Sequence, residues 1–130
     1  MDAVTWRIVY FKDNKGESPV KAFFEQPSDK GITEAETKQF EKRLRWLQAR
    51  GLDILKERKD VLETLEGEDN VYSLRVPSKV NNARVLLCHI PNTYVLVLLH
   101  VFKEKRTKDY QKAIKIARTR RDAVLLAMDK

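Results

Sequence analysis

The chain of 130 residues has a single cysteine, Cys88, which excludes an internal disulfide and any zinc site built mainly of cysteine. It also lacks a Gly-rich phosphate loop, a His-Cys pattern with metal-ligand spacing, and a carboxylate pair at a spacing that suggests acid–base chemistry. We therefore expect neither a metal site nor a small-molecule cofactor.

Long apolar runs are absent too. The longest, Tyr94–Phe102, has nine residues and is far shorter than the ~20 residues of a membrane span. The N-terminal residues contain no apolar signal core. We expect a soluble, cytoplasmic protein without a membrane partner.

Positive charge is concentrated in one half of the sequence. Residues 1–70 hold 13 Lys or Arg against 15 Asp or Glu, whereas residues 71–130 hold 13 against 4. The whole net charge of +7 therefore comes from the C-terminal half. Such asymmetry predicts a polyanionic partner such as RNA or DNA, although a solvated basic face would give the same count.

Periodicity predicts a first strand over Val4–Phe11 and a helix hairpin over residues 18–50. In the hairpin, Ser18 is the expected N-cap before Pro19, and residues 27–31 break the two helices. Thr33 and Glu36 have capping-box spacing, and Gly51 is the expected stop. Residues 51–70 suit either a short helical turn or an edge segment.

The second half predicts three more strands, over Val71–Val76, Ala83–Ile90 and Tyr94–Phe102, with the last of them central. A closing helix capped by Asp109 follows. Its expected apolar stripe consists of Tyr110, Ala113, Ile114, Ala117, Val124, Leu125 and Met128. The order β-α-α-β-β-β-α over residues 1–130 predicts one α+β domain, with a mostly antiparallel sheet that carries the helices against one face.

Seven segments carry short motifs in a fixed order along the chain. They are Trp6–Tyr10, Ser18–Val20 with Phe23-Phe24, Leu47–Gly51, Val71–Arg75, Ala83–Leu86, Leu98–Lys105, and the helix positions Ile114, Ala117 and Arg120. Together they resemble the RelE/ParE superfamily of bacterial toxins, most closely its phage-derived HigB-like branch. Four positions depart from the family pattern: Ser73 replaces the usual Glu, Ala83 an aromatic residue and Glu104 a Lys, and Tyr110 stands where a "tP" segment usually starts the last helix.

The resemblance implies the toxin of a type II toxin–antitoxin system with a RelE-like fold. Many members cut mRNA in the ribosome without a metal, by attack of a ribose 2′-OH on the adjacent phosphate, which leaves a 2′,3′-cyclic phosphate and a 5′-OH. The implied partners are mRNA, the ribosome and a cognate helix-turn-helix antitoxin.

The resemblance also implies where the chemistry lies. Arg84 matches the family's strand arginine, and a guanidinium can bind two phosphate oxygens at once. Lys105 matches a paired lysine, and Tyr110 stands where it could stack on a base, donate a proton or simply pack. The predicted catalytic residues are Arg84, Lys105 and Tyr110, and the predicted RNA contacts are Arg75, Lys103, Arg106 and Lys108.

Other chemically capable side chains are expected to be structural. His89 and Arg84 differ by an odd number of positions and fall on opposite faces of one strand, barring a bulge. We expect His100 to be a hydrogen-bonded structural residue and Cys88 to be a small buried side chain. Trp46 is either core or part of a partner surface.

Two other functions fit the same resemblance. A ParE-like inhibitor of DNA gyrase would not need Arg84, Lys105 and Tyr110 to converge on a phosphate. A non-catalytic remnant that still binds an antitoxin is kept open by the four departures from the family pattern.

Overall fold

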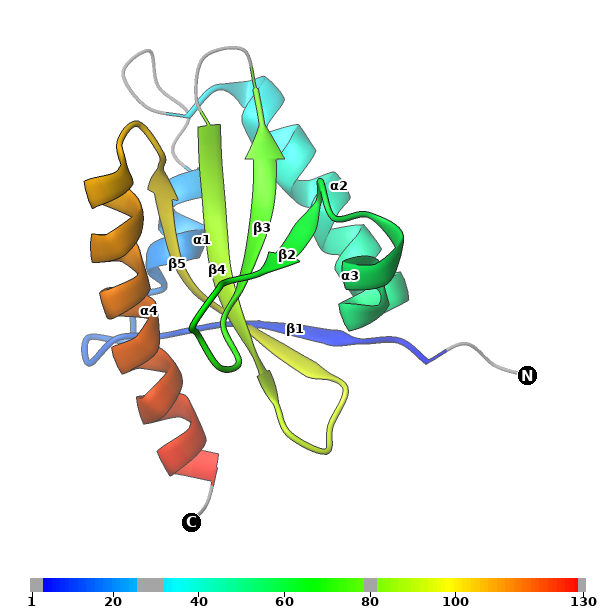
Figure 1. Cartoon of the computed structure of the whole chain (residues 1–130), viewed down its shortest axis with the longest axis vertical. Coiled ribbons are helices and arrows are strands. Elements are labelled where there is room, and N and C mark those ends of the chain that lie inside the picture. Colours follow the sequence, from blue (N-terminus) through cyan, green and yellow to red (C-terminus); the bar gives the residue numbers. More distant parts are fainter. Residues whose placement is uncertain (1–3, 26–31, 79–81, 129–130) are drawn as a thin grey trace.

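The computed structural model of the protein describes residues 4–25, 32–78 and 82–128. The elements are β1 (Arg7–Tyr10), α1 (Pro19–Glu25), α2 (Glu34–Arg50), the 3₁₀ turn η1 (Gly51–Asp53), α3 (Ile54–Glu57), β2 (Leu62–Thr64), β3 (Tyr72–Pro77), β4 (Asn82–Ile90), β5 (Val95–Lys103) and α4 (Thr107–Met128). The five strands form one sheet in the order β1-β5-β4-β3-β2 (Figure 1). The β1–β5 pair is parallel and the other pairs are antiparallel, so the predicted α+β class is confirmed.

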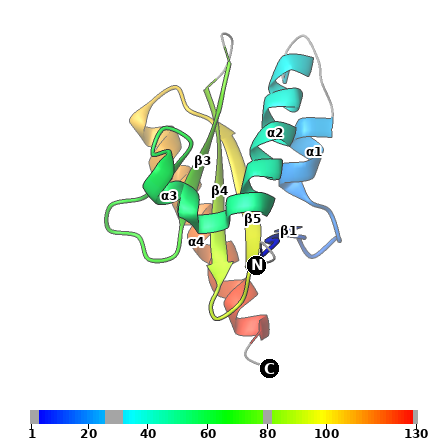
Figure 2. The same cartoon turned by 90° about the vertical axis from the view of Figure 1, so that its right-hand side faces the viewer.

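The helices cover both faces of the sheet, which corrects the expectation of a single covered face. Helices α1 and α2 lie on one side and α4 lies on the other (Figures 1 and 2). Each face has its own apolar cluster, with Val85 and Leu87 of β4 in the first and Leu86 and Cys88 in the second. A strand that is apolar on both faces has to be covered on both.

The middle position of the sheet belongs to β4 rather than to β5 as predicted. Both strands are buried along most of their length, so their sequences look alike. Their pairing shifts register: Leu86 is opposite His100, but Leu87 is opposite Leu98. The extra residue in β5 is a bulge, and beyond it Phe102 packs with the cluster on the α4 face.

Local signals placed the helix ends well. Thr33 and Glu36 form the predicted capping box of α2, and the N–H of Gly51 donates to the carbonyl of Leu47. Pro19 opens α1 as predicted, but the buried hydroxyl of Ser18 has no hydrogen-bond partner among the described residues. The predicted break at residues 27–31 lies outside the described residues.

Helix α4 begins two residues before the predicted cap. Asp109 lies in its first turn, where the carboxylate accepts the backbone N–H groups of Arg106 at 3.0 Å and Lys105 at 3.3 Å. The last turn extends past the sheet (Figure 1), so Met128 is exposed rather than part of the apolar stripe.

The undecided stretch 51–70 contains both of its alternatives, a short helix and an edge strand, in α3 and β2. No helix in the described ranges is long and apolar enough to cross a membrane. Nor do these ranges hold a group of three or more His, Cys, Asp or Glu side chains that could bind a metal.

Candidate functional site

The site is built around Arg84, in the middle strand of the sheet. Arg84 lies on the face that α4 covers and is 7% exposed. In the sheet register it is directly opposite Arg75 of β3 on one side and Phe102 of β5 on the other. A guanidinium at this depth needs compensating partners, because an unpaired buried charge is costly.

Two carboxylates supply that compensation. Nη1 of Arg84 donates to Glu63 Oε1 at 2.8 Å, and Nε donates to Glu104 Oε2. The sequence showed no carboxylate pair, and this expectation is corrected here: Glu63 and Glu104 are 41 positions apart but meet on one side chain. Burial lowers the pKa of Arg84, but Glu104, Tyr110 and Glu63 together raise it, and the net pKa is raised.

One nitrogen of this guanidinium is left for a ligand. Among the described residues, Nη2 takes part in none of the hydrogen bonds that Arg84 makes, which involve only Nε and Nη1. The hydroxyl of Ser73 lies 3.5 Å from Nη1, at the long limit of a hydrogen bond. Arg84 is therefore fixed by its carboxylates while it keeps donors for an added anion.

Tyr110 of α4 closes the site from the other layer. Its ring lies 5.3 Å from the guanidinium carbon of Arg84 and packs edge-on against Phe102 at 5.3 Å. Burial raises the pKa of Tyr110; contacts with Ser73 and Arg84 lower it but do not outweigh burial. At neutral pH the hydroxyl is therefore protonated and is a proton donor rather than a base.

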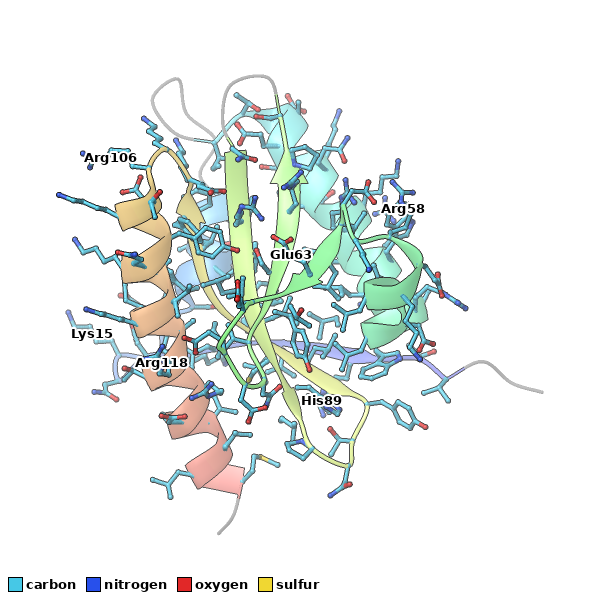
Figure 3. All side chains as sticks on the ribbon, in the orientation of Figure 1. Lys15, Arg58, Glu63, His89, Arg106 and Arg118 are labelled. Carbon is cyan, nitrogen blue, oxygen red and sulfur yellow. The ribbon has the colours of Figure 1, made fainter. Side chains whose placement is uncertain are left out.

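A cationic rim follows directly after β5. Lys105, Arg106 and Lys108 are exposed, and Lys103 is half-buried. Within this rim Glu104 turns inward to Arg84, and its N–H donates to the carbonyl of Asn82 at 2.9 Å. In Figure 3, Arg106 lies beside the start of α4, and Glu63 lies on β2, on the other side of β3 and β4.

The predicted site residues thus separate into two groups. Arg84 and Tyr110 are in contact, and Arg75 is the cross-strand neighbour of Arg84. Lys105 has an exposed side chain in the rim and, among the described residues, no ion-pair partner. It is near the site along the chain but is not part of the buried cluster.

Sequence reasoning missed the roles of Glu63 and Glu104. Glu63 lies in the edge strand that the sequence left undecided, and its position next to Ser73 follows only from the β2–β3 register. Ser73 and Glu104 stood out only as departures from a family pattern. Both departures are side chains that contact Arg84. Together they could have indicated that the partners of this arginine differ from those in the family pattern.

The other chemically capable side chains lie elsewhere. His89 faces the α2 side, where its ring packs on Trp6 at 5.7 Å, as its strand position predicted. His100 faces α4 and accepts a hydrogen bond from Arg120 at Nδ1, 3.3 Å away. Burial and Arg120 lower the pKa of His100 to about 4, and burial raises that of Cys88 to about 11.

Comparison with known proteins adds two likenesses. Residues 30–122 match the sequence model of the family described as phage derived protein Gp49-like (DUF891). A solved structure of the E. coli toxin RelE, a double arginine-to-alanine mutant in the free state, is similar with a TM-score of 0.47 and 15% identity, over 85% of this chain and 96% of that one. No curated protein sequence matches.

Proposed function

Because the chain belongs to the phage-derived Gp49-like family, a RelE-like branch of the toxins of toxin–antitoxin systems, we propose that it is a metal-independent mRNA endonuclease that acts in the cytoplasm on mRNA under translation. Its partners are then the ribosome and a cognate helix-turn-helix antitoxin. The observation that carries this proposal is the contact between Arg84 and Tyr110, beside an exposed cationic rim.

The proposed reaction is in-line transfer within the RNA strand. The 2′-oxygen attacks the adjacent phosphorus, the P–O2′ bond forms and the P–O5′ bond breaks. The free Nη2 donors of Arg84 bind a non-bridging oxygen, on which charge grows in the transition state. Lys105 and Arg106 of the rim hold neighbouring phosphates.

Two protons have to move. We assign the 5′-oxygen proton to Tyr110, because burial keeps its hydroxyl protonated at neutral pH. The 2′-OH proton goes to Glu104, whose carboxylate is next to the same guanidinium and is 27% exposed. Lys105, predicted from the sequence to be catalytic, has an exposed side chain and is assigned to phosphate binding instead.

The test is inducible expression in a bacterium, with growth and RNA 5′ ends as readouts. Arg84→Lys keeps the buried charge but loses the fork of donors, so cuts in translated messages should fall by about 10²-fold or more. Tyr110→Phe should have an effect of similar size. Arg7→Ala removes an exposed cation on β1 and should cut like the wild type.

Circular dichroism of each purified variant separates loss of chemistry from loss of fold. Growth arrest with intact RNA would contradict the nuclease proposal and point to gyrase inhibition. Equal cutting by wild type and by both folded site variants would show that Arg84 and Tyr110 are not the site.

One observation favours a second candidate, a non-catalytic protein that keeps the antitoxin interface. Glu63 and Glu104 together neutralise Arg84, so the buried arginine is fully explained as a structural cross-link. This candidate predicts soluble wild-type protein that binds its antitoxin but causes neither arrest nor new RNA ends.

A further inference from the structure

A second arginine cluster lies on the α2 side of the molecule, outside the site described above. Arg43 of α2 is 9% exposed, and among the described residues its Nε and Nη1 atoms have no hydrogen-bond partner. Buried guanidinium donors without acceptors are rare, because their lost hydration is not repaid. Within the described part of the chain, no acceptor satisfies these two nitrogens.

Asp60, the acidic side chain that raises the pKa of Arg43, is already engaged by another arginine. Asp60 accepts two hydrogen bonds from Arg58, from Nε at 2.9 Å and from Nη2 at 2.8 Å. Burial lowers the pKa of Arg43, Asp60 raises it, and Arg58 and Arg75 lower it further. The net pKa is lowered, chiefly by burial, and Arg58 and Arg75 add positive charge near Arg43 that a bound anion would balance.

An aromatic ring is part of the same cluster. The half-buried ring of Trp46 has three cations around it, with Arg43 at 5.3 Å, Arg58 at 5.5 Å and Lys42 at 5.8 Å from its centre. Cations that bind phosphate beside an aromatic ring that can stack on a base are the usual means of holding a single-stranded nucleic acid. A carboxylate-rich protein would bind the cations but would gain less from the ring of Trp46, because it has no bases to stack on it.

Arg75 connects this cluster to the candidate site. It is directly opposite Arg84 in the β3–β4 register, and it is close enough to Arg43 to lower the pKa of that side chain. In Figure 3, Arg58 lies on one side of Glu63 and Arg106 lies on the other. Arg75 is thus a positive charge that lies near both Arg84 and Arg43.

We propose that Arg43, Arg58 and Trp46 form a subsite for single-stranded RNA, in which the two guanidinium groups bind a phosphodiester and Trp46 stacks on a neighbouring base. The choice of RNA as the ligand rests on the proposed function. The subsite lies outside the Arg84 site, so it contributes to binding and not to the proton transfers.

The test measures binding of a fluorescein-labelled oligonucleotide that is fully 2′-O-methylated and so cannot be cut. Anisotropy titrations over a series of salt concentrations compare wild type with Arg43→Met and with Arg45→Met. Arg45 is an exposed arginine on the same helix, so both variants lose one charge and differ only in position. Arg43→Met should weaken binding about tenfold and reduce the salt slope by about 1, whereas Arg45→Met should stay within about twofold.

Two further readouts keep the test decisive. Binding should quench tryptophan fluorescence in the wild type, and most of that quenching should be lost in Trp46→Phe while Trp6 remains. Because Arg43→Met removes an uncompensated buried charge, its melting temperature should not fall below that of the wild type. A lower melting temperature with unchanged affinity would show that Arg43 only packs against Trp46, and would overturn the subsite.

Other outcomes of these titrations would also support or overturn the proposed subsite. No binding by the wild type, or equal weakening by Arg43→Met and Arg45→Met, would overturn the proposal. Binding of a polyglutamate peptide that depends on Arg43, without binding of the oligonucleotide, would assign the cluster to an acidic protein. If Arg43 governs oligonucleotide affinity but no RNA is cut in cells, the subsite stands and the nuclease function fails. If RNA is cut in cells but oligonucleotide affinity does not depend on Arg43, the nuclease function stands and the subsite fails.

Discussion

At the scale of single residues, Gly51 shows how one position can be fixed by backbone and packing together. It has φ +53° after the last turn of α2, and a Cβ added there would overlap the ring of Trp6. The sequence indicated a helix stop at Gly51, but not that a tryptophan from the first strand segment packs on it. Only glycine satisfies both conditions.

Replacing Gly51 by alanine should therefore be more harmful than a positive φ alone would make it. We expect Gly51→Ala to lower the free energy of unfolding by about 2–4 kcal/mol, from strain and overpacking together. Gly67→Ala is the matched control, because Gly67 has φ +78° and open space around a Cβ. It should cost about 1 kcal/mol, and equal losses in urea denaturation would contradict the packing argument.

His100 gives the protein a defined pH dependence. Its pKa is about 4 in the folded protein against an ordinary value of 6.5, so protonation favours the unfolded chain. The stability it contributes is complete above pH 6.5 and is lost as the pH falls toward 4. Because the ring is partly exposed, we expect a loss on the order of 1–2 kcal/mol.

Urea denaturation at several pH values tests this. The stability difference between wild type and His100→Asn should change over that pH window, since the variant has no group to titrate there. A difference that is constant from pH 7 to pH 4 would show that His100 is not the titrating group.

At the scale of elements, local signals fixed helix ends and tertiary pairing fixed strands. The N-terminus of α2 was readable because Thr33 and Glu36 satisfy each other's backbone donors within four residues. The edge strand β2 was not readable, because its three residues exist as a strand only through pairing with β3. Arg84 then joins β2 and the loop after β5 to the middle strand through Glu63 and Glu104.

Removal of the α2 cap should have a measurable and local cost. Thr33→Ala is expected to lower the free energy of unfolding by about 1 kcal/mol, since one backbone donor of the first turn loses its acceptor. Thr119→Ala is the control within α4, where the hydroxyl bonds back to the carbonyl of Lys115 at 3.1 Å. That change should be neutral or slightly stabilising, and an equal loss in both variants would exclude a capping effect.

At the scale of the whole molecule, the sheet has two apolar faces and each needs its own cover. Helix α4 packs on the second cluster, which contains Leu86, Cys88 and Leu99. A sheet left open on this side would expose a large contiguous apolar surface, which favours association. The last helix is therefore part of the core and not an appendage.

A chain that ends at residue 106 should lose cooperative thermal unfolding and bind a hydrophobic dye such as ANS. Its Cys88 should react quickly with a thiol reagent, whereas in the intact protein burial raises the thiol pKa to about 11 and slows the reaction. A chain that ends at residue 125 loses only residues beyond Val124 and serves as the control. Unreactive Cys88 in the shorter chain would show that α4 does not cover this face.

The sequence by itself determined the class of fold, the positions of the longer helices, the basic C-terminal half and the family resemblance, because these depend on periodicity, capping and composition within short windows. It also singled out Arg84 and Tyr110. The tertiary structure decided which face of the sheet each helix covers. A strand with apolar side chains on both faces has the same sequence pattern whichever helix covers each face. The tertiary structure also decided the partners of Arg84, since Glu63, Ser73 and Glu104 reach Arg84 only through strand register and a bulge.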